Sequence, residues 1–513
     1  MAVASQVPRP ASSIAADLPL SIASPEEFAC VREFFHHSAF DDVTLCRILR
    51  IQDMGGFGRV RWDEVPLESL PQPQRWCIQV FLRGLLAAEP ESRQVCGKEV
   101  FAALFSMGLL RPARKTPGAV VCPVWAYPVD GFVVVSDLCQ GSEGEPYKPP
   151  PPDVVFPAIY SGTLRFLQLM PEARNGEALD LCGGSGVGAL HLSRTARAAA
   201  TADVTERAAL FAEFNARLNG APVTSLCGDL YDPARGRQFD LITAHPPFVP
   251  AAGQNMVYRD GGDTGEDIIH RIVEGLPACL RPGGTCVVLC VARDTAERQF
   301  ELRAWDWLGA ARAEFDVVFG LEHVMSVEEV VESMRQRGQH IGEETARELL
   351  ARLRSFGTRQ FVYGALFLRR YPQAVNQPPA RVHLTPAGRA EDFARLLAWR
   401  CLCRQAGFDG WLAHARPRLA PQLQLTVRHA VKEGELAPVE FMFSVERGFQ
   451  AALRLDGWVV PLLARLEGKR SVAEIIETAR QANELPEGFT LGAFADLVKM
   501  MIERGFLEVD APA

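Results

Sequence analysis

A glycine-rich turn after a short apolar run is the first feature of the sequence whose residues could do chemistry. The run 178–181 leads into residues 182–188, which hold four glycines. Glycine has no Cβ, so a turn built from it lets the backbone come close to a ligand. In an open α/β sheet, ligands bind at the carboxyl ends of the strands. We therefore predict that this turn holds a ligand, either an adenosyl cofactor or a dinucleotide.

Aspartates at the ends of the next strands favour the adenosyl cofactor. Asp203 follows the apolar run 198–202, and its carboxylate can accept hydrogen bonds from both ribose hydroxyls of an adenosine. Asp229 follows the run 223–226, where it can receive an adenine amino group. Because Asp180 is in register with these two, we interpret it as part of the cofactor site and not only as a cap for the turn.

A histidine, two prolines and a phenylalanine follow the fourth run. The run 239–243 leads through one alanine into His245, Pro246, Pro247 and Phe248. The two prolines could simply terminate the strand. Four motifs at successive strand ends, in this order and spacing, instead indicate one site that includes these residues.

The alternation of apolar runs and helical patterns predicts the elements that position these residues. Strands are predicted at 178–181, 198–202, 223–226, 239–243, 285–291, 316–319 and 360–368, with helices at 190–197, 206–219 and 268–280. Short strands that alternate with helices of about ten to fifteen residues indicate βαβ units and a parallel sheet. We therefore predict an α/β fold with a Rossmann-like, seven-stranded sheet over residues 153–370.

Taken together, these motifs resemble the class I S-adenosylmethionine-dependent methyltransferases. The resemblance is to the small-domain and HemK/PrmC-like branch, which carries an Asn/Asp-Pro-Pro-Tyr/Phe motif, and it extends over residues 130–370. Segments 258–262 and 280–284 match the later part of the same pattern. The resemblance implies S-adenosylmethionine as cofactor.

The resemblance also implies a role for each matched position. The residues expected to bind the cofactor are Tyr160, Thr163, Asp180, Cys182, Gly184, Gly186, Asp203, Asp229 and His245. Within this set, Asp203 would hold the ribose and Asp229 the adenine, and the residues around the turn would surround the methionine part. The resemblance implies a catalytic role for His245, Pro246, Pro247 and Phe248, and Phe248, Tyr258 and Arg259 are expected to contact the acceptor.

Two residues depart from the family pattern. Cys182 stands where the family usually has its first glycine, and His245 replaces the Asn or Asp that accepts a hydrogen bond from the acceptor NH₂. A neutral imidazole can accept one hydrogen bond as Asn does, and it can also take a proton near neutral pH. Three roles stay open for His245. It acts as a base or orienter for a hydroxyl, carboxyl or ring nitrogen, it orients the acceptor as Asn does, or its ring only packs.

Composition limits the classes of partner and compartment. A formal net charge of −8 disfavours a nucleic-acid acceptor without excluding a local basic groove. The thirteen cysteines include no C-x-x-C pair, which indicates reduced thiols and no metal site. We see no signal peptide and no apolar run of the ~20 residues that a membrane span needs. We therefore expect a cytoplasmic protein without membrane contact.

Proline-rich segments divide the chain into the predicted domains. These are a flexible leader (1–24), a mainly helical N-terminal domain (25–145), the methyltransferase domain (153–370) and a winged-helix-like C-terminal domain (380–513). The last domain is predicted from helices at 458–466, 472–479 and 494–504 and a strand at 505–509. Residues 443–513 hold 8 Lys and Arg against 11 Asp and Glu, so we expect protein, peptide or homodimer contacts there and not DNA binding.

The sequence thus predicts a methyltransferase that moves a methyl group to nitrogen or oxygen of a small-molecule or peptide acceptor. The alternative is an N-methyltransferase of a protein glutamine or an RNA base. A second alternative is a non-catalytic scaffold that binds the cofactor.

Overall fold

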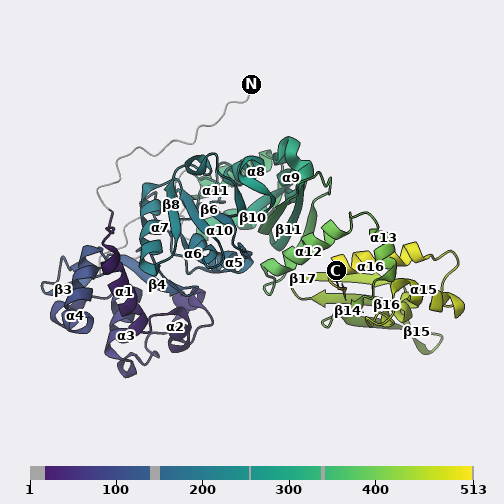
Figure 1. Ribbon diagram of the computed structural model, residues 1–513, viewed down its shortest axis with the longest axis horizontal. Helices are drawn as coiled ribbons and strands as arrows, with labels where there is room; N and C mark the ends of the chain where they lie inside the picture. Colours follow the sequence, from purple (N-terminus) through teal and green to yellow (C-terminus); the bar gives the residue numbers. More distant parts are fainter. Residues whose placement is uncertain (1–17, 139–150, 253–255, 337–340, 511–513) are drawn as a thin grey trace. The chain divides into compact units, whose positions relative to one another are not determined.

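The computed structural model describes residues 18–138, 151–252, 256–336 and 341–510 (Figure 1). Residues 1–17 of the predicted leader and most of the first predicted linker lie outside the described residues. The described chain divides into two compact units. The first holds residues 18–167, 172–247 and 256–260, and the second holds 168–171, 248–252 and the residues from Gly261 onward.

The first unit opens with helices and short strands. Its helices are α1 (Pro25–His37), α2 (Asp42–Leu49), α3 (Gln72–Cys77) and α4 (Glu89–Ser106). Its short strands are β1 (Ala87–Ala88), β2 (Arg111–Pro112), β3 (Ala119–Val121), β4 (Val124–Val129) and β5 (Phe132–Asp137), of which β4 and β5 form an antiparallel pair. Helix α1 begins where Ser24 caps it, because the Ser24 hydroxyl and the Glu27 side chain exchange hydrogen bonds with each other's backbone N–H groups.

Four parallel strands form the sheet of the first unit. They are β6 (Glu177–Leu181), β7 (Ala198–Asp203), β8 (Val223–Cys227) and β9 (Phe239–Ala244), in the spatial order β9-β6-β7-β8. All four lie where the apolar runs predicted them. Numbered along the chain this order is 4-1-2-3, which is the 3-2-1-4 part of a Rossmann sheet.

Helix α7 (Glu206–Asn219) has the predicted bounds, whereas α6 (Val187–Leu192) does not. The prediction placed α6 at 190–197. It begins earlier because Gly186 takes a left-handed conformation directly before it, and it ends at Leu192 because the chain must turn back before β7. Helix α5 (Ser161–Leu169) precedes the sheet.

The second unit carries the later strands of the same fold. Strand β12 (Thr358–Arg370) lies antiparallel between β10 (Leu280–Thr295) and β11 (Phe315–Met325). The helices among them are α8 (Asp267–Cys279), α9 (Phe300–Trp307), α10 (Val327–Met334) and α11 (Glu343–Ser355). With β6–β9 these strands make the seven that the sequence predicted, and the Rossmann-like fold of residues 153–370 is confirmed.

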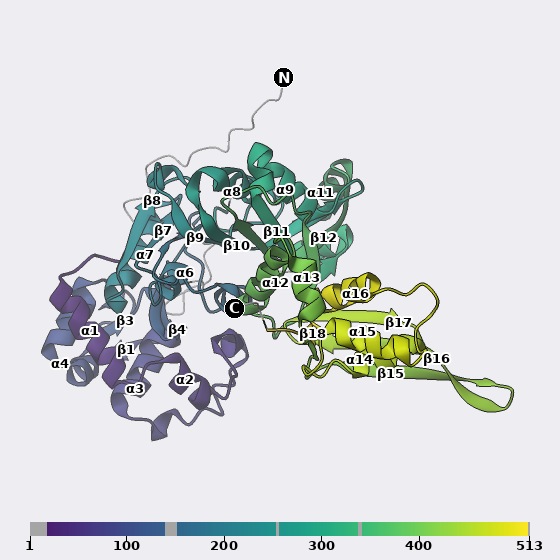
Figure 2. The same ribbon diagram turned by 45° about the vertical axis from the view of Figure 1, so that its right-hand side comes forward.

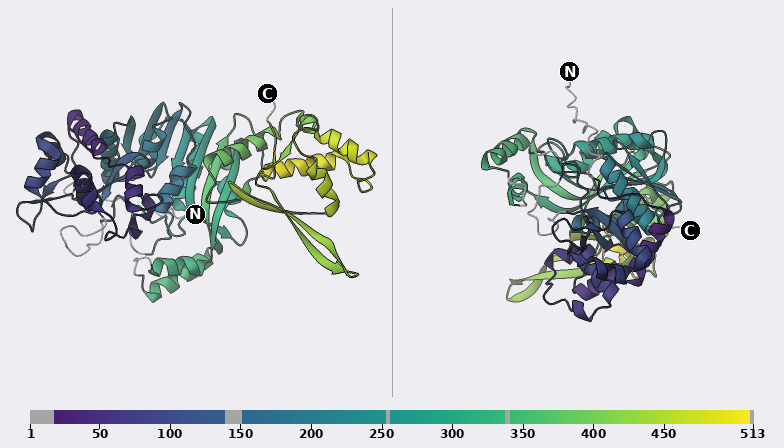
Figure 3. Two further views of the ribbon diagram at one scale, coloured as in Figure 1. Left: turned by 90° about the horizontal axis from the view of Figure 1, so that it is seen from below. Right: turned by 90° about the vertical axis from the view of Figure 1, so that its left-hand side faces the viewer.

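Strands from the C-terminal region extend the sheet of the second unit. Strand β13 (Ala380–Leu384) pairs in parallel with β11, and β17 (Phe449–Leu455), β16 (Glu435–Glu446) and β15 (Gln424–Lys432) follow in antiparallel order. The hairpin of β15 and β16 projects as a long arm (Figure 2, Figure 3). At its end the paired side chains of Val431 and Leu436 are both exposed.

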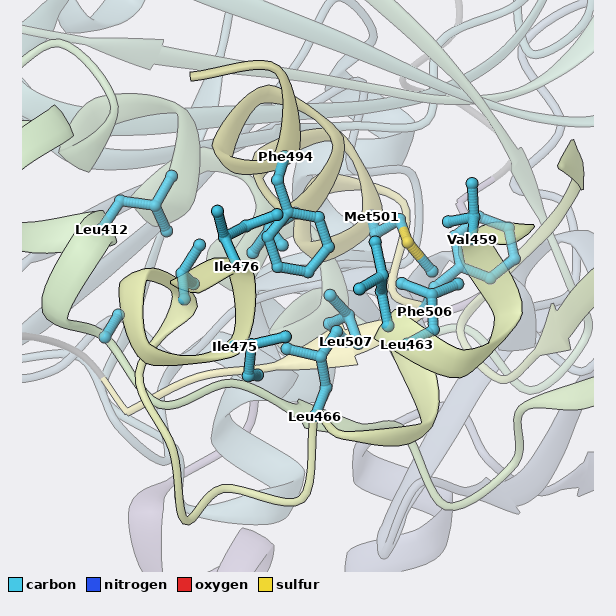
Figure 4. Packing of buried hydrophobic residues seen from close by; sticks show 14 of the residues in the cluster. Leu412, Val459, Leu463, Leu466, Ile475, Ile476, Phe494, Met501, Phe506 and Leu507 are labelled. Carbon is cyan, nitrogen blue, oxygen red and sulfur yellow. The ribbon is translucent and has the colours of Figure 1, made fainter. Parts of the chain in front are cut away.

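The last helices enclose a hydrophobic core of their own (Figure 4). The helices of this region are α12 (Ala390–Leu402), α13 (Phe408–His414), α14 (Val460–Ala464), α15 (Val472–Gln481) and α16 (Leu491–Glu503). Leu463, Ile475 and Phe494 come from α14, α15 and α16 and are almost fully buried. The short strands β14 (Arg418–Leu419) and β18 (Leu507–Glu508) pair beside this core. Three helices and a closing strand thus lie at the predicted places, and their grouping as a winged-helix-like domain stays a prediction.

Among the residues that the structure describes, every helix is too short or too polar to span a lipid bilayer.

A buried ion pair joins the N-terminal region to the first sheet. The Arg207 guanidinium of α7 donates to both Asp137 oxygens of β5, at 2.7 Å from Nε and 2.5 Å from Nη2. The backbone N–H of Val155 donates to the same carboxylate at 2.8 Å. Asp137 and Arg207 are 6% and 8% exposed. Removing either side chain would take from the other its partner in a buried ion pair, which is strongly destabilising.

We therefore expect Asp137→Ala to lower the free energy of unfolding by about 3–5 kcal/mol, measured by urea denaturation. The matched control is Glu213→Ala, which removes the exposed partner of Arg217 on the same helix and should cost less than about 0.5 kcal/mol. Equal losses in the two variants would contradict this view of the Asp137 pair.

Candidate active site

The carboxyl ends of the four parallel strands meet at one edge of the sheet. Leu181 of β6 pairs with Ala202 of β7 on one side and with Ala244 of β9 on the other. Asp203 of β7 pairs with Cys227 of β8. The motifs that follow these positions therefore lie side by side, at the edge where an open α/β sheet binds its ligand.

The turn after β6 has a left-handed backbone at three of its residues. The φ angles of Cys182, Gly184 and Gly186 are 56°, 52° and 79°. This conformation is strained for cysteine and easy for glycine, which explains why glycine is usual at the position of Cys182. An added Cβ on Gly186 would lie 2.9 Å from the Cβ of Ala212 in α7, whereas one on Gly184 would meet no atom within 4 Å. The turn thus packs on α7 and faces open space at Gly184.

Asp203 holds the turn from the end of β7. Its Oδ2 accepts a hydrogen bond from the Gly184 N–H at 3.0 Å, and its Oδ1 accepts one from the Thr205 N–H at 3.2 Å. Burial raises the pKa of Asp203, and these backbone N–H groups offset part of that effect. Asp203, which is predicted to hold the ribose, therefore lies against the turn that is predicted to hold the methionine part of the cofactor.

Asp180 lies behind the turn and is 2% exposed. Its Oδ1 accepts a hydrogen bond from the Thr243 hydroxyl of β9 at 2.8 Å. Burial, together with the nearby charge of Asp203, raises the pKa of Asp180 to about 7, although the bond from Thr243 lowers it. Asp180 thus connects β6 to β9 beneath the site, and its contribution to cofactor binding stays a prediction.

Asp229 lies at the end of the next strand and is exposed. The N–H of Gly228 donates to the Asp203 carbonyl oxygen at 2.9 Å, which holds the end of β8 against β7. Asp229 therefore lies one strand beyond Asp203, and its contact with the adenine stays a prediction.

The His245 ring packs against α5. An added Cβ on Gly162 would lie 3.6 Å from its Cε1, and the Phe166 ring centroid lies 5.4 Å from its own. Burial lowers the pKa of His245 to about 4, so the imidazole is neutral at pH 7. Phe248 belongs to the second unit, where its carbonyl oxygen lies against the backbone of Gly265.

Three exposed rings form a stack that we call the aromatic ladder: Tyr160, Phe156 and Tyr258. Phe156 lies between the two tyrosines, with ring centroids 4.8 Å from Tyr160 and 5.0 Å from Tyr258 and interplanar angles of 23° and 6°. Sequence reasoning selected both tyrosines and missed Phe156, which brings them together. Thr163, also predicted here, lies half-buried in the first turn of α5.

Arg259 forms its ion pair within its own loop. Its guanidinium lies 2.8 Å from Asp260 Oδ1, and the two side chains are 11% and 12% exposed. The other oxygen of Asp260 accepts the Met256 N–H at 2.9 Å. The pair therefore fixes the loop that carries Tyr258, and an acceptor contact by Arg259 stays a prediction.

Comparison with known proteins finds a family model that matches the part of the chain around these strand ends. Residues 157–304 match the family model described as methyltransferase small domain. Residues 157–304 of this chain are therefore a methyltransferase small domain. The predicted recognition is confirmed, and S-adenosylmethionine is the cofactor of the domain.

Curated relatives of the methyltransferase domain differ in what their names say they modify. The release factor glutamine methyltransferase of Geobacter sulfurreducens is 33% identical over 123 residues, which are 21% of this chain and 43% of the relative. The ribosomal protein uL3 glutamine methyltransferase of Xanthomonas campestris is 32% identical over 138 residues (24% and 44%). The ribosomal RNA small subunit methyltransferase C of Alcanivorax borkumensis is 28% identical over 141 residues (26% and 40%). This chain spans less than half the length of each.

The position of Asp203 predicts the result of its removal. Asp203→Ala should weaken binding of S-adenosylhomocysteine by ~1–3 kcal/mol for each lost hydrogen bond to the buried ligand, measured by calorimetry. The control is Asp232→Ala, which removes an exposed surface partner of Arg235 and should leave affinity unchanged. Wild-type affinity in folded Asp203→Ala protein would show that this carboxylate does not hold the ribose.

Proposed function

We propose that this protein transfers the methyl group of S-adenosylmethionine to the planar side-chain amide nitrogen of a protein or peptide. The observation that carries the proposal is the position of His245. It packs against α5 directly after β9, beside the glycine-rich turn, at the strand end where the family places its acceptor-orienting residue. This proposal takes up the protein-glutamine alternative that the sequence left open. It departs from the small-molecule or peptide acceptor that the sequence predicted first, for which no relative described above gives support.

The cofactor supplies a methyl group already activated on a sulfonium, so the chain has to orient the acceptor and exclude water. A neutral imidazole with a pKa of about 4 is a weak base at pH 7, but its unprotonated ring nitrogen is a hydrogen-bond acceptor. His245 therefore takes one N–H of the acceptor amide, and a backbone carbonyl of the two prolines takes the second. The amide nitrogen would then present its lone pair to the methyl group. As the N–C bond formed, the C–S bond would break to leave S-adenosylhomocysteine, and the methylated amide would lose a proton to solvent.

Two further observations support a protein-borne acceptor. The relatives from Geobacter and Xanthomonas are both named as glutamine methyltransferases, and glutamine carries the planar amide that this geometry suits. The net charge of −8 opposes tight binding of a polyanion. We further propose that the C-terminal winged-helix-like region contacts the protein acceptor or a second copy of the chain. The free cysteines of the described residues support a reducing, cytoplasmic location.

An RNA base is the second candidate acceptor, and two observations favour it. The relative from Alcanivorax is named as a ribosomal RNA methyltransferase. The aromatic ladder exposes flat rings on which a base can stack, since stacking on aromatic side chains is a common way to bind unpaired bases.

The acceptor class is tested by incubating the protein and labelled S-adenosylmethionine with extract from cells that lack the protein. We expect label in a macromolecular fraction that protease releases and ribonuclease does not. Label that ribonuclease releases, or label in the small-molecule fraction, would overturn the protein-amide proposal in favour of the RNA base or the small molecule.

The role of His245 is tested by the pH dependence of His245→Asn. Because the wild-type imidazole stays neutral above its pKa of about 4, we expect the ratio of wild-type to variant rates to be constant from about pH 6 to 8.5. A general base with an ordinary histidine pKa of about 6.5 would instead make that ratio rise through this value. His245→Ala should lower the rate and leave cofactor affinity nearly intact.

A further inference from the structure

Two asparagines of α7 bind the free edge of strand β5. The Asn215 side chain accepts from the Val135 N–H at 2.8 Å and donates to the Val135 carbonyl at 2.9 Å. Asn219 accepts from the Val133 N–H at 2.9 Å and donates to the Val133 carbonyl at 2.8 Å. Each side-chain amide therefore occupies the place of a residue in a neighbouring strand.

The spacing of the two elements makes this pairing regular. Residues four apart on a helix are separated by about 6 Å along its axis. Alternate residues of a strand are separated by about 6.7 Å. The near match lets one face of α7 follow alternate residues of β5, and the ion pair of Arg207 with Asp137 continues the same contact at the end of the strand.

Asn215 differs from Asn219 in the partner of its third side-chain hydrogen bond. Asn219 donates to the backbone carbonyl of Asn215 within the helix, at 2.8 Å. Asn215 instead donates to the carbonyl oxygen of Ser185, at 2.9 Å, in the middle of the glycine-rich turn. Asn215 is fully buried and Ser185 is 4% exposed, so water cannot readily replace this bond. Three residues along the helix from Asn215, Ala212 supports Gly186 of the same turn.

We propose that Asn215 is a positioning residue for the cofactor, because its one amide holds both strand β5 of the N-terminal region and the turn that receives S-adenosylmethionine. The inference rests on the cofactor site described above. If the inference is right, the N-terminal region contributes to cofactor binding through strand β5. If β5 leaves α7, the amide loses two of its three hydrogen bonds and no longer holds the Ser185 carbonyl in a fixed orientation.

Asn215→Leu and Asn219→Leu form a matched pair for the test. Both replace an asparagine by a side chain of similar size and remove one pair of hydrogen bonds to β5, but only Asn215→Leu leaves the Ser185 carbonyl without its donor. We expect Asn215→Leu to weaken binding of S-adenosylhomocysteine about tenfold, or ~1.4 kcal/mol. Asn219→Leu should change the affinity less than about twofold, since it leaves the hydrogen bond of the turn intact.

A second measurement separates positioning from general destabilisation. Hydrogen exchange at the amides of residues 183–186 should be faster than wild type in Asn215→Leu and unchanged in Asn219→Leu, with both proteins measured below their unfolding temperatures. If Asn215→Leu does not fold, Asn215→Ser replaces it, because serine removes the same amide with less change in the core.

The outcomes distinguish this inference from the proposal on which it rests. Equal effects of the two substitutions on affinity and exchange, or no effect of either, would overturn the role of Asn215. If wild-type protein binds no S-adenosylhomocysteine, the cofactor site itself is wrong, and the exchange comparison still shows whether Asn215 orders the turn.

Discussion

The glycine-rich turn after β6 has to meet two opposed demands, because it must leave its inner side open to a ligand and yet keep one conformation. Few of its own side chains can help, since a Cβ at most of its positions is excluded or strained. The structure solves this by holding the turn from outside. Asp203 binds the N–H of Gly184, Asn215 binds the carbonyl of Ser185, and α7 packs against Gly186. The conformation of the turn therefore depends on the packing of β7 and α7 more than on its own side chains.

The local parts of this arrangement could be predicted from sequence. Each of the four parallel strands is a short apolar run that can be recognised from its own residues. Once the strands are placed, the strand ends that carry Asp203, Asp229 and His245 follow directly. Helix α7 has the bounds that its helical pattern predicts, and in the structure Thr205 caps its start and Gly220 takes the left-handed conformation that ends it. Helix α6 was misplaced because the pattern did not show that the turn leads straight into a helix.

The long-range parts could not be predicted from one sequence. Phe156 joins Tyr160 to Tyr258 across about a hundred residues of chain, and no local pattern marks it as part of the site. In the sequence, Asn215 looks like an ordinary polar residue within a helix. Only the position of β5 shows that its side-chain amide is buried and that both its oxygen and its nitrogen make hydrogen bonds. In the same way, the sequence left the role of His245 open because it does not reveal burial, and burial lowers the pKa of the ring and so favours orientation of the acceptor over proton transfer.

The central claim is that an adenosyl cofactor lies along the carboxyl ends of β6, β7 and β8, against the turn that Asp203 and Asn215 hold. A crystal structure of the protein with S-adenosylhomocysteine tests this most directly. The account predicts both ribose hydroxyls on the Asp203 carboxylate, the adenine beside Asp229 and the homocysteine part over Gly184. A ligand bound elsewhere, or a ribose that makes no contact with Asp203, would contradict it.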